Sequence, residues 1–439
     1  MSNEVTFAIC GCGQRGLLTY APYAKEYPEK ARIVAGADPD PLRLEVLRQE
    51  YAVSSSMCFP SAEALLKAPK SADVMIISTQ DREHAAYAVK ALQKGYHVLL
   101  EKPVSPDLAE CLQVQQEAHR TGKNVVVCHV LRYTPFYSTI KAALNRGEIG
   151  KLISIDAVEG IGYWHFAHSY VRGNWKNSTT SSPMILAKSC HDMDLLRWLA
   201  DSPCKAVSSA GSCAFFNPQN APIGSADFCS DCAVRQDCPY DAEAIYLHHR
   251  KWGCCNGNRG WPCSVVTPNP TEDTLRSALH RGPYGRCVFH CDNDVADHQT
   301  VLLTFENNVT ATFTVCAFTE ECHRTIRLMG THGEIQGDIE KNELTVHQFG
   351  CPPQIIHFDV VDDSHAGHGG GDFGLMDEVC KVIKNNTDIR TAIDASIESH
   401  FMAIAAEYSR LHGEVRVLMP KTDAAIQQFI NAVKEKGSD

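Results

Sequence analysis

The chain has 439 residues, of which 44% are hydrophobic and 21% charged. This composition is typical of a globular protein of two or three domains. The formal net charge is −11 without a long basic run, which argues against nucleic acid or an anionic membrane as the main partner. No apolar run approaches the roughly 18 residues that cross a membrane. Because the first residues lack the pattern of a signal peptide, we expect a cytoplasmic enzyme.

A glycine-rich turn follows the first apolar run. Residues 5–10 predict a buried strand, and Gly11-Cys12-Gly13-Gln14-Arg15-Gly16 comes directly after it, before a helix-compatible stretch at 17–27. In a dinucleotide-binding fold the first glycine permits a tight turn, the second lets the pyrophosphate approach, and the third packs helix on strand. We expect this turn and the helix N-terminus to bind the phosphates of the cofactor.

Asp38 ends the second apolar run, residues 31–37. A carboxylate at this place hydrogen-bonds the ribose hydroxyls of NAD and repels the 2′-phosphate of NADP. The alternative interpretation makes Asp38 a helix cap before Pro39. Arg15 and Arg43 are close enough in the chain to allow some use of NADP, but NAD is the preferred cofactor.

Further apolar runs at 73–78, 96–100 and 124–130 alternate with helical patterns. Ligands of such sheets lie at the carboxyl ends of the strands. Besides the glycine-rich turn and Asp38, the expected cofactor contacts are therefore Ser78, Gln80, His84, Glu101, Lys102 and His129. Lys102 falls near the nicotinamide end, where an ammonium group stabilises oxyanion character as hydride leaves. A surface lysine after a strand is the alternative.

Several segments in the same order resemble the Gfo/Idh/MocA family of glucose–fructose oxidoreductases and inositol dehydrogenases. They are residues 11–16, Glu101-Lys102-Pro103, residues 147–151, and His191 followed by residues 194–199. The resemblance implies an α/β fold, with a Rossmann domain at 1–130 and a C-terminal domain at 131–375 that carries a large, mostly antiparallel sheet. Helices at 376–439 would pack on both. It also implies a homo-oligomer, dimer or tetramer, because that sheet often serves as an interface.

The resemblance also carries catalytic roles. It makes Lys102 catalytic and lets His191 share the proton transfer, in an NAD(P)-dependent oxidation or reduction at a hydroxyl-bearing carbon. Many members have an aspartate four residues before that histidine, whereas this chain has Ala187 there, followed by Lys188. We expect Lys188 to alter the electrostatics of the site, or another residue to orient His191.

The second half of the chain offers candidate substrate contacts. His191 and Asp194 are three residues apart, on one face of a predicted helix. Residues 163–170 are dense in aromatic and imidazole side chains, which suit sugar rings, although such stretches also occur as packing loops. Residues 365–372 place three glycines between His368 and Asp372, resembling an active-site loop of related sugar-acting members; a flexible turn is the alternative. The expected substrate contacts are Arg132, Tyr163, His165, His168, Arg172, Asp194, His368 and Asp372.

A cysteine-rich insertion interrupts the family pattern at about residues 214–294. Of the 20 cysteines in the chain, which we expect to be reduced, Cys229, Cys232 and Cys238 have the C-x2-C-x5-C spacing of metal ligands. Cys287 is the preferred fourth ligand over Cys254, Cys255, Cys263 and Cys291. Structural zinc is expected, with an iron–sulfur cluster or no metal as the alternatives. The insertion would act as a lid or an oligomer contact.

These observations predict an NAD-dependent dehydrogenase that oxidises a secondary hydroxyl of a sugar or sugar derivative. Neutral sugars and acidic sugars are both candidate substrates. An acidic sugar is included because Arg132, Arg172 and Lys188 could pair with its carboxylate. The alternative is a redox-neutral enzyme that oxidises C3 of a glycoside transiently, eliminates the aglycone, adds water and returns the hydride. A non-catalytic NAD-binding sensor is less consistent with the presence of both Lys102 and His191.

Overall fold

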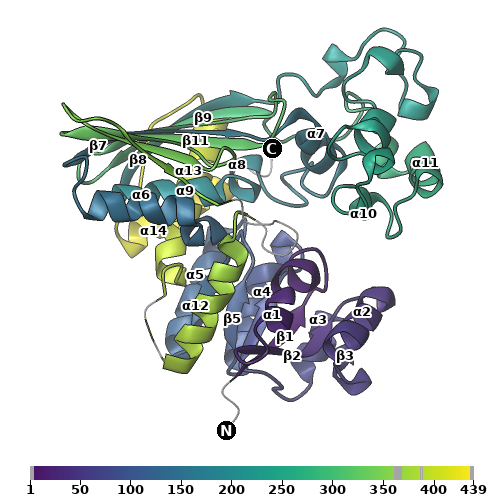
Figure 1. Ribbon diagram of the computed structural model, residues 1–439, viewed down its shortest axis with the longest axis horizontal. Helices are drawn as coiled ribbons and strands as arrows, with labels where there is room; N and C mark the ends of the chain where they lie inside the picture. The colour runs from purple at the N-terminus through teal and green to yellow at the C-terminus, as the bar shows by residue number, and fades with distance from the viewer. Residues whose placement is uncertain (1–3, 360–367, 386, 388, 436–439) are drawn as a thin grey trace.

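Two β-sheets organise the protein, one in each half of the chain (Figure 1). The computed structural model describes residues 4–359, 368–385, 387 and 389–435. Residues 365–367 of the predicted glycine-rich loop lie outside this range. The predicted fold class, a parallel Rossmann sheet followed by a mostly antiparallel sheet, is confirmed.

The first sheet is parallel and has six strands in the order β3-β2-β1-β4-β5-β6. Its strands are short apolar runs, because helices cover both faces and leave no solvent side for polar residues. They are β1 (Val5–Cys10), β2 (Ala31–Ala37), β3 (Cys58–Phe59), β4 (Val74–Ile77), β5 (His97–Leu100) and β6 (Val125–Val127). The helices between them are α1 (Pro22–Glu26), α2 (Pro41–Tyr51), α3 (Ala62–Lys67), α4 (His84–Gln93) and α5 (Leu108–Thr121), with short 3-10 turns at Ser55–Met57 and Asp81–Glu83.

The helix expected at 17–27 is divided in the structure. A π-helical turn runs over Gly16–Tyr20, and α1 begins at Pro22. Proline has no backbone N–H, so the hydrogen-bond ladder cannot continue through it and restarts there. The wide turn brings the side chain of Tyr20 into the protein interior, where it is fully buried.

The second sheet has nine strands in the order β14-β13-β12-β11-β7-β10-β9-β8-β15. All neighbouring pairs are antiparallel except β7 and β10. Buried and exposed residues alternate along β9 and β10, the signature of a sheet with one face on the core. The strands are β7 (Leu152–Gly160), β8 (Cys204–Ser212), β9 (His298–Phe305), β10 (Thr310–Cys316), β11 (His323–Gly330), β12 (Gly333–Asp338), β13 (Glu343–Gln348), β14 (Gln354–His357) and β15 (Val417–Leu418).

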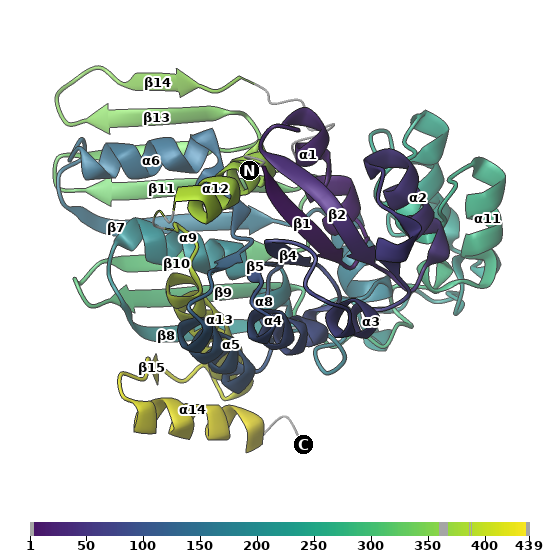
Figure 2. The ribbon, with the colours of Figure 1, turned by 90° about the horizontal axis from the view of Figure 1, so that it is seen from below.

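Helices cover one face of this sheet, and its other face is open to solvent (Figures 1 and 2). The covering helices are α6 (Pro135–Asn145), α9 (Cys190–Ala200) and α13 (Ile393–Leu411). The remaining elements of this half are α7 (Tyr163–Phe166), a π-helical turn at Ala167–Arg172, α8 (Met184–Ala187) and α14 (Asp423–Glu435). No helix among the described residues is long and apolar enough to cross a membrane.

Helix α12 (Gly371–Asn385) belongs to the second half of the chain but packs on the first sheet. Its side chains Leu375, Met376 and Val379 share one apolar core with β1 and with the 3-10 turn at Val130–Tyr133. This apolar core of the first sheet is therefore built by residues from both ends of the sequence.

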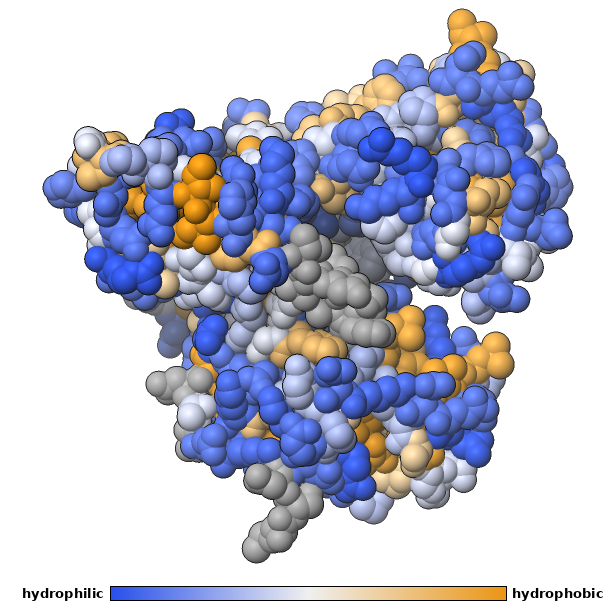
Figure 3. All heavy atoms as spheres, viewed as in Figure 1, coloured by the Kyte–Doolittle hydropathy of each residue, from blue (hydrophilic) through white to orange (hydrophobic). Residues whose placement is uncertain are grey.

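The cysteine-rich insertion lies between β8 and β9 and projects to one side of the molecule (Figure 1). It is built of short elements, which are α10 (Cys263–Val266), α11 (Glu272–Arg281) and turns at Pro218–Asn220, Cys229–Asp231, Arg235–Asp237, Ala244–His248, Cys254–Asn256 and Pro283–Gly285. Trp164 of α7 packs against it, with ring centroids 4.9 Å from Trp252 and 5.4 Å from Trp261. Figure 3 shows the surface hollowed between the insertion and the dinucleotide-binding half.

Candidate active site

The glycine-rich turn has the shape of a phosphate cradle. Gly11 has φ of +95°, and a Cβ there would lie 2.6 Å from the carbonyl oxygen of Ser78. At Gly13 the nearest atom to an added Cβ is Nη1 of Arg43 at 3.7 Å, so the backbone is open on that side. Ser78 fastens the turn by donating its hydroxyl to the carbonyl of Gly11 at 2.8 Å. A pyrophosphate can therefore approach the backbone closely at Gly13.

Asp38 lies beside this turn at the end of β2 and is buried. Its carboxylate accepts the backbone N–H groups of Cys12 at 2.8 Å and of Asp40 at 2.9 Å, while Nη1 of Arg43 is 3.5 Å away. The helix cap of α2 is Asp40 rather than Asp38. Asp38 is thus held by the turn itself, in the place expected for a ribose contact.

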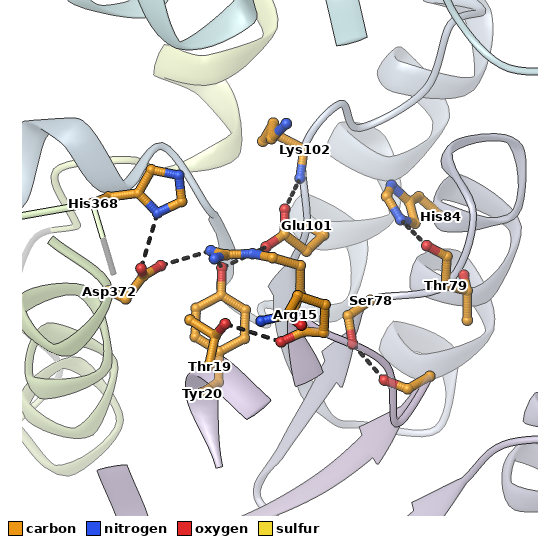
Figure 4. A network of polar contacts seen from close by, with 12 residues as sticks. Arg15, Thr19, Tyr20, Ser78, Thr79, His84, Glu101, Lys102, His368 and Asp372 are labelled. Atoms are coloured by element: carbon orange, nitrogen blue, oxygen red, sulfur yellow. Dashed lines mark hydrogen bonds and ion pairs between the residues drawn. The ribbon is translucent and has the colours of Figure 1, made fainter. Parts of the chain in front are cut away.

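A buried polar network joins the turn to α12 (Figure 4). The guanidinium group of Arg15 donates to Glu101 at 2.5 Å, to Asp372 at 2.6 Å and to the hydroxyl of Tyr20. Tyr20 also donates its hydroxyl to Glu101 at 2.5 Å. Burial alone would raise the pKa of Asp372, but Arg15 and His368 offset it and hold the pKa at about 2. Burial would also raise the pKa of Glu101, but Arg15 lowers it below its usual value. Both carboxylates are therefore ionised, and three hydrogen bonds hold Arg15 in this network.

His368 stands at the edge of this network. Its Nδ1 lies 2.9 Å from Oδ2 of Asp372, and its side chain is 37% exposed while that of Asp372 is fully buried. The backbone of His368 has φ of +55°, and Gly369 and Gly370 also have positive φ. The imidazole lies 5.9 Å from that of His191, measured between ring centroids.

Lys102 and His191 converge at the carboxyl end of β5. Nζ of Lys102 donates to the carbonyl of Ala187, the last residue of α8, at 3.0 Å. His191 follows in the first turn of α9 and is 5% exposed. Burial lowers the pKa of the His191 imidazole well below its usual value, and nearby Lys102, His129 and His368 act in the same direction. His191 is therefore neutral, and one of its two ring nitrogens carries no proton.

His129 lies behind His191, on the core side. Its ring centroid is 5.9 Å from that of His191 and 5.9 Å from that of His400. Burial lowers the pKa of His129 to about 4. Neither ring nitrogen has a hydrogen-bond partner among the described residues. The structure thus places His129 behind a candidate proton acceptor and away from the glycine-rich turn.

Arg132 and Asp194 pair with each other instead of facing the pocket. The guanidinium group donates two hydrogen bonds of 2.6 Å to the Asp194 carboxylate and one of 2.8 Å to the carbonyl of Arg390. Both side chains are buried. Oδ1 of Asp194 also lies 3.9 Å from Nε2 of His129. Arg132 and Asp194 are therefore not available as substrate contacts in this arrangement, because their charges compensate each other.

Lys188 belongs to a separate buried charge cluster. Its Nζ is 3.2 Å from Glu159, which also pairs with Arg324, and Arg324 lies 2.9 Å from Asp192. Burial raises the pKa of Asp192 well above its usual value, despite Arg324, and neighbouring Glu159 adds to this rise. Lys188 therefore compensates Glu159 and is not aimed at Lys102 or His191.

The aromatic and imidazole segment faces the insertion. His165 contacts the sulfur of Cys322 at 3.3 Å, and His168 bonds the hydroxyl of Tyr246 at 2.8 Å. Arg172 donates to the carbonyls of Arg286 and Tyr240, both at 2.7 Å, and the ring of Tyr163 lies 6.0 Å from that of Tyr240. These side chains form the packing interface that the sequence left open as an alternative.

The other predicted cofactor residues support the loops at this edge. His84 lies between the carbonyls of Pro103 at 2.7 Å and Thr79 at 3.2 Å (Figure 4). Gln80 caps the turn at Asp81–Glu83, and the carbonyl of Gln14 accepts the hydroxyl of Thr19. Tyr20 was not predicted from the sequence. Residue spacing does not indicate that a π-helical turn points this phenol towards Glu101.

A cavity of about 410 Å³ opens beside His368. Its lining includes Lys251 of the insertion, Arg324 of β11, Glu340 and Phe358. None of these was predicted from the sequence, since they meet only when the insertion folds against the second sheet. The cavity has the size and mixed polarity of a small-molecule site.

Family models match almost the whole chain. The model of an oxidoreductase family's NAD-binding Rossmann fold covers residues 5–129, and that of its C-terminal α/β domain covers residues 141–414. The chain belongs to the Gfo/Idh/MocA family. It is 23% identical over 388 residues to putative oxidoreductase YteT of Bacillus subtilis, covering 84% of this chain and 87% of that protein. It is 28% identical over 230 residues to inositol 2-dehydrogenase 4 of Saccharopolyspora erythraea, and the alignment covers 52% of this chain and 62% of that protein.

Solved structures share the fold. The WlbA dehydrogenase of Chromobacterium violaceum, determined in complex with NADH and UDP-GlcNAcA, aligns with a TM-score of 0.66 at 17% identity, over 96% of this chain and 98% of that one. An aldose–aldose oxidoreductase from Caulobacter crescentus aligns with a TM-score of 0.66 at 15% identity, over 95% and 100%. This Gfo/Idh/MocA protein is therefore an NAD-binding oxidoreductase with the family's two-domain fold.

The departure at position 187 has a structural counterpart. Where many Gfo/Idh/MocA members are expected to carry an aspartate, the main-chain carbonyl of Ala187 accepts the hydrogen bond of Lys102. A backbone acceptor can hold the amine in position whatever side chain the residue carries. The lysine thus keeps a fixed position although the carboxylate is missing.

The predicted zinc centre is not supported. Within the described part of the chain, no group of three or more His, Cys, Asp or Glu side chains is placed to hold a metal ion. The sulfur of Cys229 faces Nη2 of Arg172 at 3.6 Å. The same absence gives no support to an iron–sulfur cluster held by Cys229, Cys232, Cys238 and Cys287 among the residues that the structure describes.

Proposed function

We propose that this protein is an NAD-dependent dehydrogenase that oxidises a secondary hydroxyl group of a polyol or sugar. The observation that carries the proposal is the convergence of Lys102 and His191 at the carboxyl edge of the Rossmann sheet. Lys102 is anchored there by the carbonyl of Ala187 at 3.0 Å, and His191 is buried and neutral. A cation beside a proton acceptor is the pair that alcohol oxidation requires.

The residues at the glycine-rich turn fit a dinucleotide. Gly13 leaves the backbone open for a pyrophosphate, and Asp38 offers a carboxylate to ribose hydroxyls. When bound, NAD⁺ accepts the hydride from the hydroxyl-bearing carbon. His191 takes the hydroxyl proton at a ring nitrogen, and Nζ of Lys102 donates a hydrogen bond to the same oxygen as it gains negative charge. Asp372, Arg15 and Glu101 keep this edge of the sheet fixed.

The substrate class rests on the cavity beside His368 and on the relatives. Lys251, Arg324 and Glu340 give the cavity a polar lining that suits a compound with several hydroxyl groups. Inositol 2-dehydrogenase 4 is similar to this chain over about half its length. Both observations support a cyclitol or sugar as the substrate.

A substrate panel tests the proposal. The enzyme is mixed with NAD⁺ and, separately, with myo-inositol, scyllo-inositol, aldohexoses, hexuronates and UDP-N-acetylglucosamine derivatives, and NADH absorbance is followed. Formation of NADH with at least one polyol or sugar is the expected result. Release of an aglycone from a nitrophenyl glycoside without net NADH would instead indicate redox-neutral cleavage. An enzyme that does neither, while still binding NADH, contradicts the proposed activity.

The Asp38→Ala variant is expected to bind NADH about 10- to 100-fold more weakly, since hydrogen bonds to a charged group contribute about 1.5–3 kcal/mol. Binding of NADPH should weaken less, because the repulsion of a 2′-phosphate is removed and Arg43 remains nearby. Titration of each cofactor by its fluorescence measures both constants. Glu45→Ala is the matched control, because Glu45 is another carboxylate of α2 and pairs with Arg48 at the exposed surface. Equal affinities of the Asp38→Ala variant and the unmodified protein for NADH would contradict the assignment.

We also propose that two copies associate through the open face of the nine-stranded sheet. Leu302 and Ile355 are 50% and 55% exposed, and the strand registers place both on the face opposite the covering helices. Leu302→Glu is expected to shift the protein to a monomer in light scattering coupled to gel filtration, because a buried unpaired charge is costly. Leu411→Glu, at the exposed end of α13, should leave the mass unchanged. A wild-type monomer would contradict the interface.

A further inference from the structure

His191 sits in a nearly closed environment. Its residue is 5% exposed, and Nδ1 has no partner among the described residues. A buried base that accepts a proton in every oxidation must release it to solvent before the next turnover. A group near His191 must therefore carry that proton to solvent.

Two imidazoles lie near His191, one of them buried and the other partly exposed. His129 is 1% exposed and is followed by His400, which is completely buried. Behind His129 lies the compensated Arg132–Asp194 pair. That side ends in the core and offers no contact with solvent.

His368 leads outward. Its ring is 5.9 Å from the ring of His191 between centroids, and its side chain is 37% exposed. It also lines the cavity proposed for the substrate, together with Lys251 and Arg324. It is thus in reach of both the buried base and bulk water.

Asp372 and Arg15 fix the orientation of His368. Its Nδ1 bonds Asp372 at 2.9 Å, and that fully buried carboxylate is held in turn by Arg15 at 2.6 Å (Figure 4). A carboxylate at Nδ1 selects the tautomer whose Nε2 is free to accept a proton, and it stabilises the imidazolium ion that results. The Asp372–His368 pair therefore has the parts of a proton carrier.

We propose that His368 is the proton outlet of the active site, oriented by Asp372. The inference rests on the proposed dehydrogenase function. In the oxidation, the C–H bond gives its electron pair and hydrogen to NAD⁺ as hydride, and the hydroxyl proton passes to His191. His368 receives this proton at Nε2, directly or through one water molecule, and releases it to solvent. Reduction runs the same path inward.

The test compares His368→Ala with the wild-type holoenzyme, using the polyol with the highest rate in the panel, beginning with myo-inositol. We expect kcat to fall by about 100-fold, with the dissociation constant of NADH unchanged. Imidazole added to the buffer should restore kcat in a saturable manner, and the solvent deuterium isotope effect should rise as proton release becomes limiting. Asp372→Asn should give a smaller loss of kcat that imidazole also relieves. His119→Ala is the control, because His119 is an exposed histidine beside Asp394 and does not line the cavity.

Two results would overturn the outlet and leave the dehydrogenase intact. One is unchanged turnover of His368→Ala. The other is a loss of activity that appears mainly in KM and that imidazole does not relieve. The latter result would make His368 a substrate contact. A wild-type protein that forms no NADH with any panel member overturns the proposed function and the outlet together. Circular dichroism of each variant separates these outcomes from misfolding.

Discussion

Lys102→Met is expected to lower kcat/KM for NADH formation by about 10²- to 10³-fold, the usual loss when a donor to a developing oxyanion is removed. The amine is anchored at 3.0 Å by the carbonyl of Ala187 and lies near the buried imidazole of His191. Methionine keeps the length of the side chain but cannot donate a hydrogen bond. The binding of NADH should change little, because Lys102 stands at the reacting end of the site and not at the glycine-rich turn.

Steady-state rates with the best polyol of the panel, together with NADH titration, measure the two effects of Lys102→Met. Lys94→Met is a matched control, since Lys94 also donates its ammonium group to a main-chain carbonyl, that of Ala68, within the Rossmann half. That variant should retain full activity. If Lys102→Met turned over at the wild-type rate, the catalytic assignment would fail and another residue would have to stabilise the oxyanion.

Arg132→Met is expected to reduce the free energy of unfolding by about 3–5 kcal/mol, the typical cost of removing one partner from a buried ion pair. The two 2.6 Å hydrogen bonds to Asp194 are buried, so the carboxylate would stay buried without its cationic partner, with the His129 imidazole 3.9 Å away. Asp194→Leu should cost a similar amount. The double variant should recover most of the loss, because both charges are then removed.

Urea denaturation of the single and double variants measures this coupling. Arg146→Met serves as the control, because Arg146 pairs with Glu148 at the surface, where an ion pair contributes at most about 1 kcal/mol. A loss below about 1 kcal/mol for Arg132→Met would show that the pair is solvated. Additive losses in the double variant would show that the two side chains are not coupled.

Much of the fold could be predicted from local patterns. Parallel strands buried on both faces appear as short apolar runs, and the runs at 5–10, 31–37 and 73–78 predicted three neighbouring strands of the first sheet. The register of the second sheet and its one parallel pair were not accessible, because strands that are distant in sequence decide them. The division of the first helix depended on Pro22, whose missing N–H was not weighed.

The predicted site residues also divide into those that local patterns could place and those that they could not. Asp38, Lys102 and His191 follow strand ends or a helix start, so topology alone brings them to one edge. Charged residues such as Arg132 and Lys188 are different, because a sequence shows the charge but not its partner. The cysteine spacing has the same limit. It shows that candidate ligands are close in the chain, but not whether the fold gathers them into a metal-binding group.

The bond between Arg15 and Asp372 joins residues that are 357 positions apart. Helix α12, which begins beside it, supplies apolar side chains to the core of the first sheet. A fragment that stopped at residue 130 would expose this core and leave Arg15 with Glu101 as its one acidic partner. The cofactor-binding half consequently cannot be exchanged between relatives as a module: a working chimera would need helix α12 from the same parent.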